Sequence, residues 1–444
     1  MISFLAQRLA APALAISTGI ALCLSGCQSG PQSSDQETAQ AFDLAQPIDP
    51  TQTITVFSMF TGAQQEQFER SLIPFEEETG IDVVYEGSDA FPQLIVERVE
   101  AGEPPDIAIF PQPNLITQFA QQGELVPITD FIERGQLRKA YSDAWIDLVS
   151  VDETPYALWL RASVKSLVWY RPTAFAAQGY DIPTTWSALI ALSEQIVADG
   201  GTPWCIGLES GAATGWPGTD WIEDILLRTA GPEAYRQWIS HELPFNSPPV
   251  LKSMQSFSQI LHRPNFVDGD AKSTVSKPYG ETVLNILSEP PNCYLYRQAS
   301  FVSAYLPDDK AARVDYDVFP LPSIDERFGM PILVAGDALG MFRDTPETRA
   351  LMTYFATPEA QEILANEAGF ISPHSQFDIE KYPNLVTQKI ATILLNADVV
   401  RFDGSDMMPE TIGTDKFWKE MILFAQGKSP EAIATTLDES WPQQ

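Results

Sequence analysis

The residues best suited to chemistry are aromatic and carboxylate side chains in stretches rich in glycine and proline. The clearest case is Ala213-Thr-Gly-Trp-Pro-Gly-Thr-Asp-Trp221, which precedes a predicted helix at Ile222–Arg228. Flat aromatic faces suit the C–H faces of pyranose rings, and carboxylates accept hydrogen bonds from hydroxyls. A buried site of this kind is selective because each polar group needs a partner. The alternative is that Trp216 and Trp221 are core residues beside a helix start.

Catalytic and cofactor signatures are missing from the sequence. It has no Gly-x-x-x-x-Gly-Lys-Ser/Thr phosphate loop, no Gly-x-Gly-x-x-Gly and no Gly-x-Ser-x-Gly elbow. The three histidines, His241, His262 and His374, are scattered, so neither a metal cluster nor a Ser-His triad has support. Acidic pairs of the glycosidase type arise from abundance alone, because the chain has 59 Asp and Glu residues. We therefore expect no catalytic residue, no cofactor and no metal.

The composition excludes some partners. The formal charge of −32 argues against nucleic acid, which needs clustered Lys and Arg, and against broad contact with an anionic membrane. A content of 44% hydrophobic and 11% aromatic residues is ample for packed cores. The chain is longer than one domain usually is, so we expect more than one.

The N-terminus has the form of an export signal. Arg8 precedes an apolar, small-residue stretch from Leu9 to Leu24 that is too short and interrupted to span a bilayer comfortably. The stretch ends in Leu24-Ser-Gly-Cys27, which resembles the bacterial lipobox, whose cysteine receives a diacylglycerol. We expect a signal peptide at 1–26, lipidation at Cys27 and a flexible tether over 27–51. The alternative is an ordinary signal peptide or a short membrane helix.

Two cysteines remain in the exported chain, Cys205 and Cys293. In an oxidising compartment they most simply form a disulfide. It would close a loop of roughly ninety residues and stabilise the fold by about 4 kcal/mol on the chain-entropy model. Two buried free thiols are the alternative.

Strands and helices alternate after the tether. The patterns predict strands at Ile54–Phe57, Ile81–Tyr85 and Asp106–Phe110, with helices over Gln64–Glu78 and Phe91–Glu100. This βαβ spacing predicts an α/β lobe with a largely parallel sheet. Ligands of such sheets bind beyond the carboxyl ends of the strands. Here these ends are Ser58–Phe60, Glu86–Ser88 and Phe110–Pro113.

A second α/β unit follows. Strands are predicted at Lys165–Tyr170 and Trp204–Leu208, with a helix that opens near Trp186 and closes at Gly200. Later helices begin at Thr345, Thr357 and Ser429, each an N-cap residue followed by proline.

Several motifs, taken in order, resemble the extracellular solute-binding proteins of carbohydrate ABC transporters (family 1). These motifs are Glu103-Pro-Pro-Asp-Ile-Ala-Ile-Phe110, Lys165-Ser-Leu-Val-Trp-Tyr170, Val334-Ala-Gly-Asp-Ala-Leu339 and Asp415-Lys-Phe-Trp418. Within that family, the stretches Trp204–Asp224 and Pro290–Phe301 are similar to the α-glucoside-binding branch. The resemblance covers nearly all of the mature chain.

The resemblance implies a two-lobed α/β periplasmic-binding-protein fold, a type II-like clamp. Each lobe would hold a mostly parallel sheet flanked by helices, with hinge crossovers between the lobes. Lobe 1 would comprise residues 52–160 and 335–395, and lobe 2 residues 161–334, with lobe 2 or C-terminal helices over 396–444.

The resemblance also implies a sugar site between the lobes. Its ligand-binding residues would be Phe110, Lys165, Trp216, Asp220, Trp221, Arg297, Gln298, Gly336, Asp337, Asp406 and Trp418. The pairing of Cys205 with Cys293 is similar to this branch as well. Each residue has a structural alternative: Arg297 and Asp337 could form an ion pair, Lys165 could cap a helix, and Phe110 and Trp418 could be core.

One departure from the family concerns the ligand. Pro111 and Pro113 replace polar residues that maltose-binding relatives use after the aromatic residue, which favours a smaller ligand.

The sequence therefore predicts a receptor and not an enzyme. It would be a lipid-anchored, monomeric protein of the periplasm or cell envelope. It would bind an α-glucoside or osmolyte of the sucrose, trehalose and glucosylglycerol class and deliver it to an ABC permease by clamp closure. One alternative is an exported glycoside hydrolase acting on small glucosides. Another is a surface adhesion protein, although the sequence has no internal repeat.

Overall fold

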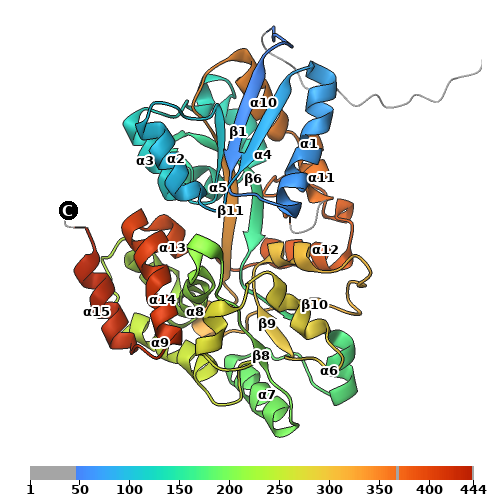
Figure 1. Cartoon of the computed structure of the whole chain (residues 1–444), viewed down its shortest axis with the longest axis vertical. Coiled ribbons are helices and arrows are strands. Elements are labelled where there is room, and N and C mark those ends of the chain that lie inside the picture. Colours follow the sequence, from blue (N-terminus) through green and yellow to red (C-terminus); the bar gives the residue numbers. More distant parts are fainter. Residues whose placement is uncertain (1–46, 367–369, 443–444) are drawn as a thin grey trace, which may run out of the picture. The chain divides into compact units, whose positions relative to one another are not determined.

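Two β-sheets with helices packed on them make up the described part of the molecule. The computed structural model describes residues 47–366 and 370–442 (Figure 1). The predicted signal peptide, Cys27 and most of the tether lie outside these residues. Within them, no helix combines the length and apolar character needed to cross a bilayer.

The first sheet has six strands. Their order is β12-β11-β3-β1-β2, with β6 beside β11. The strands are β1 (Thr53–Ser58), β2 (Asp82–Gly87), β3 (Ile107–Phe110), β6 (Ala157–Val164), β11 (Ile332–Met341) and β12 (Val400–Phe402). The β1 strand is parallel to β2 and β3, whereas β11 is antiparallel to β3 and β6. A short hairpin, β4 (Ser150–Val151) with β5 (Thr154–Pro155), stands apart.

The first sheet is covered by helices, and the sequence predicts the apolar stripe of the first of them. Phe68, Leu72 and Phe75 of α1 are at most 2% exposed, because their spacing places them on one helical face. These helices are α1 (Ala63–Thr79), α2 (Phe91–Glu100), α3 (Pro113–Gln122), α4 (Arg134–Ala140), α5 (Asp143–Asp147), α10 (Pro346–Phe355) and α11 (Pro358–Ala365), whereas α12 (Leu385–Leu395) contacts the second sheet. The predicted order of strands and helices from β1 to β3 is confirmed.

The second sheet has four strands in the order β10-β7-β9-β8. The strands are β7 (Leu167–Tyr170), β8 (Trp204–Cys205), β9 (Leu295–Arg297) and β10 (Asp317–Pro320). Only β8 and β9 are parallel, since β7 pairs antiparallel with both β9 and β10. The expectation of a mostly parallel sheet is wrong here, because β7 is flanked by strands from much later in the chain. The βαβ rhythm describes only strands joined by one crossover.

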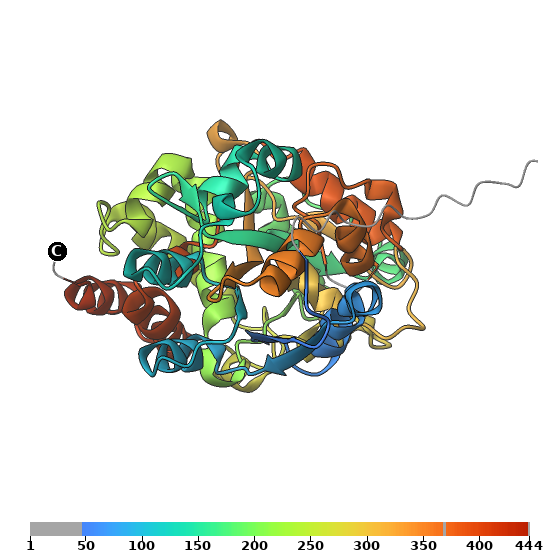
Figure 2. The ribbon, with the colours of Figure 1, turned by 90° about the horizontal axis from the view of Figure 1, so that it is seen from above.

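The remaining helices pack on and beside the second sheet. They are α6 (Pro172–Gln178), α7 (Trp186–Ala198), α8 (Trp216–Ile239), α9 (Pro248–Leu261), α13 (Gly404–Met407), α14 (Trp418–Ala425) and α15 (Pro430–Ser440). The C-terminal helices lie beside α8 and α9 although they are distant in sequence, and α15 is peripheral in both views (Figure 1, Figure 2). A disulfide joins Cys205 of β8 to Cys293, as predicted.

Three helices begin at the N-cap residues that the sequence predicts. The hydroxyls of Thr345, Thr357 and Ser429 accept hydrogen bonds from the amides three residues on, which is N-capping. Two predicted boundaries are wrong. Helix α8 begins at Trp216 rather than Ile222, and β8 ends at Cys205 rather than Leu208.

The chain passes between the two sheets at three places that lie side by side. The first is Lys165–Ser166, the second follows β10, and the third follows β12. The amide of Lys165 donates to Leu333 O, and the amide of Asp403 donates to Val334 O, both at 2.8 Å. Two of the predicted lobe boundaries fall inside strands β6 and β11. The third falls before β12, which still pairs with β11 in the first sheet.

Candidate ligand-binding site

A cavity lies where the three crossing segments meet the ends of the first sheet. Its volume is about 110 Å³. The lining comes from both sheets and their helices: Met59, Gln64, Pro111, Gln112, Arg161, Ser163, Lys165, Ser210, Ala213, Trp216, Tyr279, Phe301, Ala335, Gly336, Asp337, Asp403, Ser405, Asp406 and Trp418. Ligand sites are commonly about 300–1,000 Å³. A cavity of this size therefore fits only a small ligand, unless its walls move apart.

Aromatic rings form part of the cavity wall. Trp216 stands edge-to-face with Tyr279 at 5.0 Å and with Phe301 at 5.9 Å between ring centroids. Trp418 follows the π-helix η8 (Thr411–Phe417), a rare element that is frequent at functional sites. The two tryptophans are linked through Gly215. A Cβ at this position would lie 2.1 Å from Trp418 O, and its φ is 113°, so only glycine allows the contact.

Lys165 is held in the cavity wall by two carboxylates. Its ammonium donates to Asp220 Oδ1 at 2.9 Å and also to Asp403. The lysine lies in the first crossing segment, Asp403 in the third, and Asp220 on α8. Burial alone would lower the pKa of Lys165, but the charges of Asp220 and Asp403 outweigh it and the net pKa is raised. Lys165 therefore stays charged.

Arg161 and Asp337 form a second buried pair on the first sheet. They are directly opposite in the β6–β11 register, and Arg161 Nε donates to Asp337 Oδ2. The guanidinium also lies over the rings of Phe60 and Phe370, at 4.4 and 4.8 Å from their centroids. Strand β6 is buried along its whole length. Removing Asp337 would therefore leave the charge of Arg161 buried without a partner, which costs free energy of folding.

A second row of charges supports the first. Arg297 donates to Asp220 Oδ2 at 3.1 Å and to Asp224 Oδ2 at 3.0 Å, and Arg228 pairs with Asp224. Burial raises the pKa of Asp220 to about 6, against the opposing charges of Lys165 and Arg297. All of these groups are at most 5% exposed, so the network is rigid and desolvated.

A carboxylate behind the cavity positions the loop that carries two lining acids. The carboxylate of Glu223 accepts hydrogen bonds from the amides of Gly404 at 2.5 Å and Ser405 at 3.1 Å, and from the hydroxyl of Tyr235 at 2.9 Å. Burial and then Asp403 raise the pKa of Asp406 well above its usual range. For Asp403, Lys165 and local hydrogen bonds more than offset burial, so its pKa is lowered.

The charges at this cavity are matched in pairs. Arg161 faces Asp337 and Lys165 faces Asp403, whereas burial and the charge of Asp403 raise the pKa of Asp406, the third lining acid. The wall therefore combines aromatic faces with many hydrogen-bonding groups and little uncompensated charge. Such a wall fits a neutral, hydroxyl-rich molecule. Among the described residues, no group of three or more His, Cys, Asp or Glu is placed to hold a metal ion.

The structure brings six of the eleven predicted residues to the cavity. These six are Lys165, Trp216, Gly336, Asp337, Asp406 and Trp418. Asp220 and Arg297 lie directly behind Lys165. The Gln298 side chain donates a hydrogen bond to the hydroxyl of Tyr296 and accepts one from the amide of Ala299.

Two predicted aromatic residues lie in cores instead of the cavity. Phe110 is fully buried among Phe91, Phe119 and Phe342, and it is the following residues Pro111 and Gln112 that line the cavity. Trp221 stacks on Phe257 at 5.1 Å, one and a half turns into α8. Neither ring can contact a ligand in this cavity, because other side chains enclose it.

Sequence reasoning missed several lining residues. Gln112, Arg161, Asp403, Tyr279 and Phe301 were not among the predicted site residues, and all five line the cavity. A signal existed for Arg161, the lone charge inside a strand that is apolar apart from Ser163. For Tyr279 and Phe301 no local pattern distinguished them from other aromatic residues.

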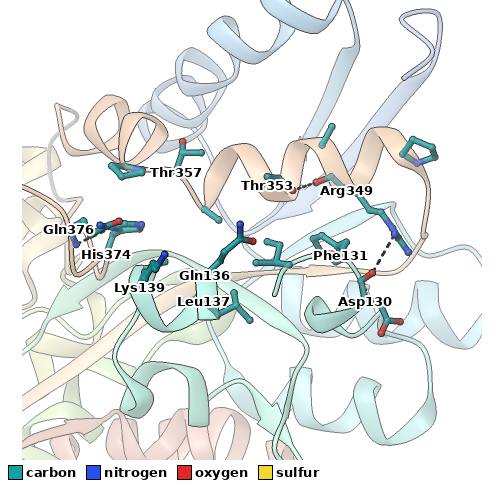
Figure 3. Close-up of a pocket in the computed structure, with 16 residues that line it drawn as sticks. Asp130, Phe131, Gln136, Leu137, Lys139, Arg349, Thr353, Thr357, His374 and Gln376 are labelled. Atoms are coloured by element: carbon teal, nitrogen blue, oxygen red, sulfur yellow. Dashed lines mark hydrogen bonds between the residues drawn. The ribbon is translucent and has the colours of Figure 1, made fainter. Parts of the chain in front are cut away.

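A larger cavity, of about 660 Å³, lies between α4 and α10 (Figure 3). Two of its polar side chains form hydrogen bonds within the protein. Arg349 pairs with Asp344 and reaches Asp130 O at 3.5 Å, and His374 Nδ1 accepts the amide of Gln376. None of the predicted site residues lines it. We therefore place the candidate site at the smaller cavity.

Comparison with known proteins agrees with this architecture. Residues 58–362 match the family model of bacterial extracellular solute-binding proteins. The osmoprotective compounds-binding protein GgtB of Synechocystis is 47% identical, covering 88% of this chain and 92% of that protein. The alpha-glucosides-binding periplasmic protein AglE of Rhizobium meliloti is 38% identical, covering 88% and 87%.

Solved structures share the fold. The bacterial solute receptor AcbH superposes with a TM-score of 0.75 at 20% identity, covering 87% of this chain and 96% of AcbH. RafE in complex with raffinose gives a TM-score of 0.71 at 18% identity, covering 87% and 98%. The two-lobed α/β solute-binding fold is thus confirmed. By its sequence and its fold, the chain belongs to the bacterial extracellular solute-binding proteins.

Proposed function

We propose that this protein is the substrate-binding component of an ABC importer and that it binds an α-glucoside or a small glucosylated osmolyte. The ligand would occupy the cavity lined by Trp216, Trp418, Lys165, Arg161 and Asp406. Sucrose, trehalose and glucosylglycerol are the compounds of this class that we would test first.

One observation carries the proposal: the cavity joins aromatic faces to charges that are already paired. Aromatic rings pack on the apolar faces of a sugar, and paired charges donate and accept hydrogen bonds without demanding a charged ligand. The names of the two relatives, which refer to osmoprotective compounds and to alpha-glucosides, support this ligand class. The small volume favours a ligand of one or two rings.

Binding would act through closure of the two lobes. Arg161 and Gln112 belong to the first sheet and its helices, whereas Trp216 and Trp418 belong to α8 and α14. A ligand that contacts both sets stabilises the closed arrangement by its differential affinity and shifts the population toward it. The permease would then recognise the closed form. In this scheme the ligand shifts the conformational population of the protein, and the protein leaves the ligand chemically intact.

The N-terminus would keep the protein at the membrane. We infer that Cys27 carries a lipid, so that the monomeric body is anchored outside the cytoplasm, in the periplasm or cell envelope. The tether at 27–51 would let the body reach its permease. The Cys27→Ser variant should lose incorporation of labelled fatty acid and leave the membrane fraction. Retention of label by this variant would contradict the anchor.

Calorimetric titration of the full-length protein in detergent tests the ligand class. The panel is sucrose, trehalose, glucosylglycerol, maltose and glucose, with glucose 6-phosphate as a charged control. We expect micromolar or tighter binding of at least one neutral glucoside and no binding of the phosphate. Failure of every neutral sugar to bind would remove the proposal. Release of glucose from the bound compound would instead support an exported glycoside hydrolase.

A further inference from the structure

Three residues of the cavity wall each carry a buried polar atom that lacks a hydrogen-bond partner. These atoms are Gln112 Oε1, Arg161 Nη1 and Trp418 Nε1, and within the described residues none of them meets a protein donor or acceptor. The three side chains are only 5%, 5% and 7% exposed. An orphaned buried polar atom costs free energy in the free protein, so it calls for a partner that the protein itself does not supply.

Arg161 cannot satisfy its free nitrogen by moving. Its Nε is bound to Asp337, and its guanidinium is enclosed by the rings of Phe60 and Phe370. The donor is therefore fixed before any ligand arrives, which reduces the entropy lost on binding.

The charge of Arg161 is matched by Asp337, so its free N–H suits a neutral oxygen better than an anion. Asp337 itself lines the cavity beside it. An arginine and an aspartate held side by side can bind two adjacent hydroxyls: the carboxylate accepts a hydrogen bond from one hydroxyl, and the guanidinium donates a hydrogen bond to the oxygen of the other.

The other two atoms come from different parts of the fold. Gln112 is the N-cap residue of α3, at the end of β3, and Trp418 begins α14 beside α8. Trp418 Nε1 can only donate, whereas Gln112 Oε1 can only accept. A ligand that satisfies all three atoms must offer two acceptor oxygens and one hydroxyl proton.

We propose that Gln112, Arg161 and Trp418 are the residues that determine ligand specificity, by reading the hydroxyls of one neutral sugar through atoms that are unpaired in the free protein. Arg161, together with Asp337, would bind a vicinal diol, and Trp418 Nε1 would add a directed hydrogen bond to its stacking contact. This inference rests on the proposed function and adds the atoms that select the ligand.

The test compares matched variants of the full-length protein. Gln112→Met removes the orphaned carbonyl in the cavity. Gln67→Met removes an equally orphaned, buried carbonyl on α1 that does not line the cavity. Trp418→Phe keeps an aromatic face without Nε1, and Arg161→Lys keeps the charge without Nη1. Affinity is measured by calorimetry with the tightest binder among sucrose, trehalose and glucosylglycerol, and the melting temperature checks folding.

We expect Gln112→Met, Trp418→Phe and Arg161→Lys each to weaken binding about tenfold or more, because a buried ligand hydroxyl loses its partner. Gln67→Met should bind within about twofold of wild type. Gln112→Met should also melt no lower than wild type, since it removes an unsatisfied group.

Monodeoxy analogues of the same sugar provide a second measurement, which does not depend on any variant folding well. At least one analogue should bind wild type about tenfold more weakly yet lose no further affinity in the matching variant. Full affinity in all three cavity variants, or additive losses for every analogue, would overturn the assignment and leave the proposed function standing. A wild-type protein that binds no sugar would overturn both.

Discussion

The Lys165 ammonium donates to Asp220 across the junction between the two sheets, at 2.9 Å and with both side chains at most 6% exposed. Lys165 lies where the chain first leaves the first sheet, and Asp220 lies in the second turn of α8. This contact ties the cavity wall to the helix that begins at Trp216. Because the pair is desolvated, neither residue can lose its partner without a large cost.

Lys165→Met should therefore destabilise the fold as well as the site. It leaves Asp403 buried without its cation and Asp220 with Arg297 alone, which we expect to lower the free energy of unfolding by about 3–5 kcal/mol at pH 7. Urea denaturation at pH 7 measures the change. The control is Lys419→Met on α14, which breaks an exposed ion pair with Asp415 of η8. This variant should lower the free energy of unfolding by less than about 0.5 kcal/mol. Equal stability of the two variants would contradict the buried network.

Trp418→Ala should weaken sugar binding by about 2 kcal/mol or more, which is roughly thirtyfold in affinity. The reason is the loss of a large aromatic face that is 7% exposed and lines the cavity. Calorimetric titration with the best sugar of the panel measures the effect. Trp441→Ala is the matched control, since Trp441 stacks on His241 and does not line the cavity. Unchanged affinity in Trp418→Ala would exclude its stacking role.

Asp406→Asn should stabilise the protein increasingly as pH rises above about 4. The folded pKa of Asp406 is raised by burial and by Asp403, so the folded state holds its proton more tightly than the unfolded chain does. The stability that Asp406 contributes is therefore fully present below its pKa in the unfolded chain, near 3.8, and is lost as pH rises through its pKa in the folded protein. Asparagine imitates the protonated form and removes this loss.

The difference between wild type and Asp406→Asn should grow by up to about 1.4 kcal/mol per pH unit inside that window and then level off. Urea unfolding of both proteins from pH 4 to pH 8 measures it. Asp415→Asn, at an exposed position of η8, should show no comparable trend. A difference that shrinks with rising pH would mean that Asp406 is ionised in the folded protein.

Replacing Cys205 and Cys293 by alanine should lower the free energy of unfolding by about 4 kcal/mol, because the disulfide closes a loop of 88 residues. Sugar affinity should stay within about twofold, since neither cysteine lines the cavity. Both are at most 1% exposed, so reductant should act only after partial unfolding. Rapid reduction of the native protein would contradict that burial.

Several helices and the strands β1, β2 and β3 of the first sheet could be predicted because their signals are local. Apolar spacing identified α1 and α2, and the Thr-Pro and Ser-Pro pairs marked the starts of α10, α11 and α15. The second sheet could not be predicted. Its strand β7 pairs with β9 and β10 from distant parts of the chain, and no local pattern encodes that pairing.

The sequence by itself determined the family, the alternation of strands and helices in the first sheet, and six of the residues that line the cavity. It could not separate a ring in the core from one in the cavity. Phe110 and Trp221 have the residue type of a sugar platform, but each is enclosed by other rings.

Only the tertiary structure decided which side chains meet. Arg161 and Asp337 are 176 residues apart and become neighbours through the β6–β11 register. Gln112, Arg161 and Trp418 share one cavity only because segments from three parts of the chain converge there. The physical reason is that unsatisfied hydrogen-bonding capacity belongs to a packed arrangement of atoms, and residue types alone do not reveal which of them will remain unpaired.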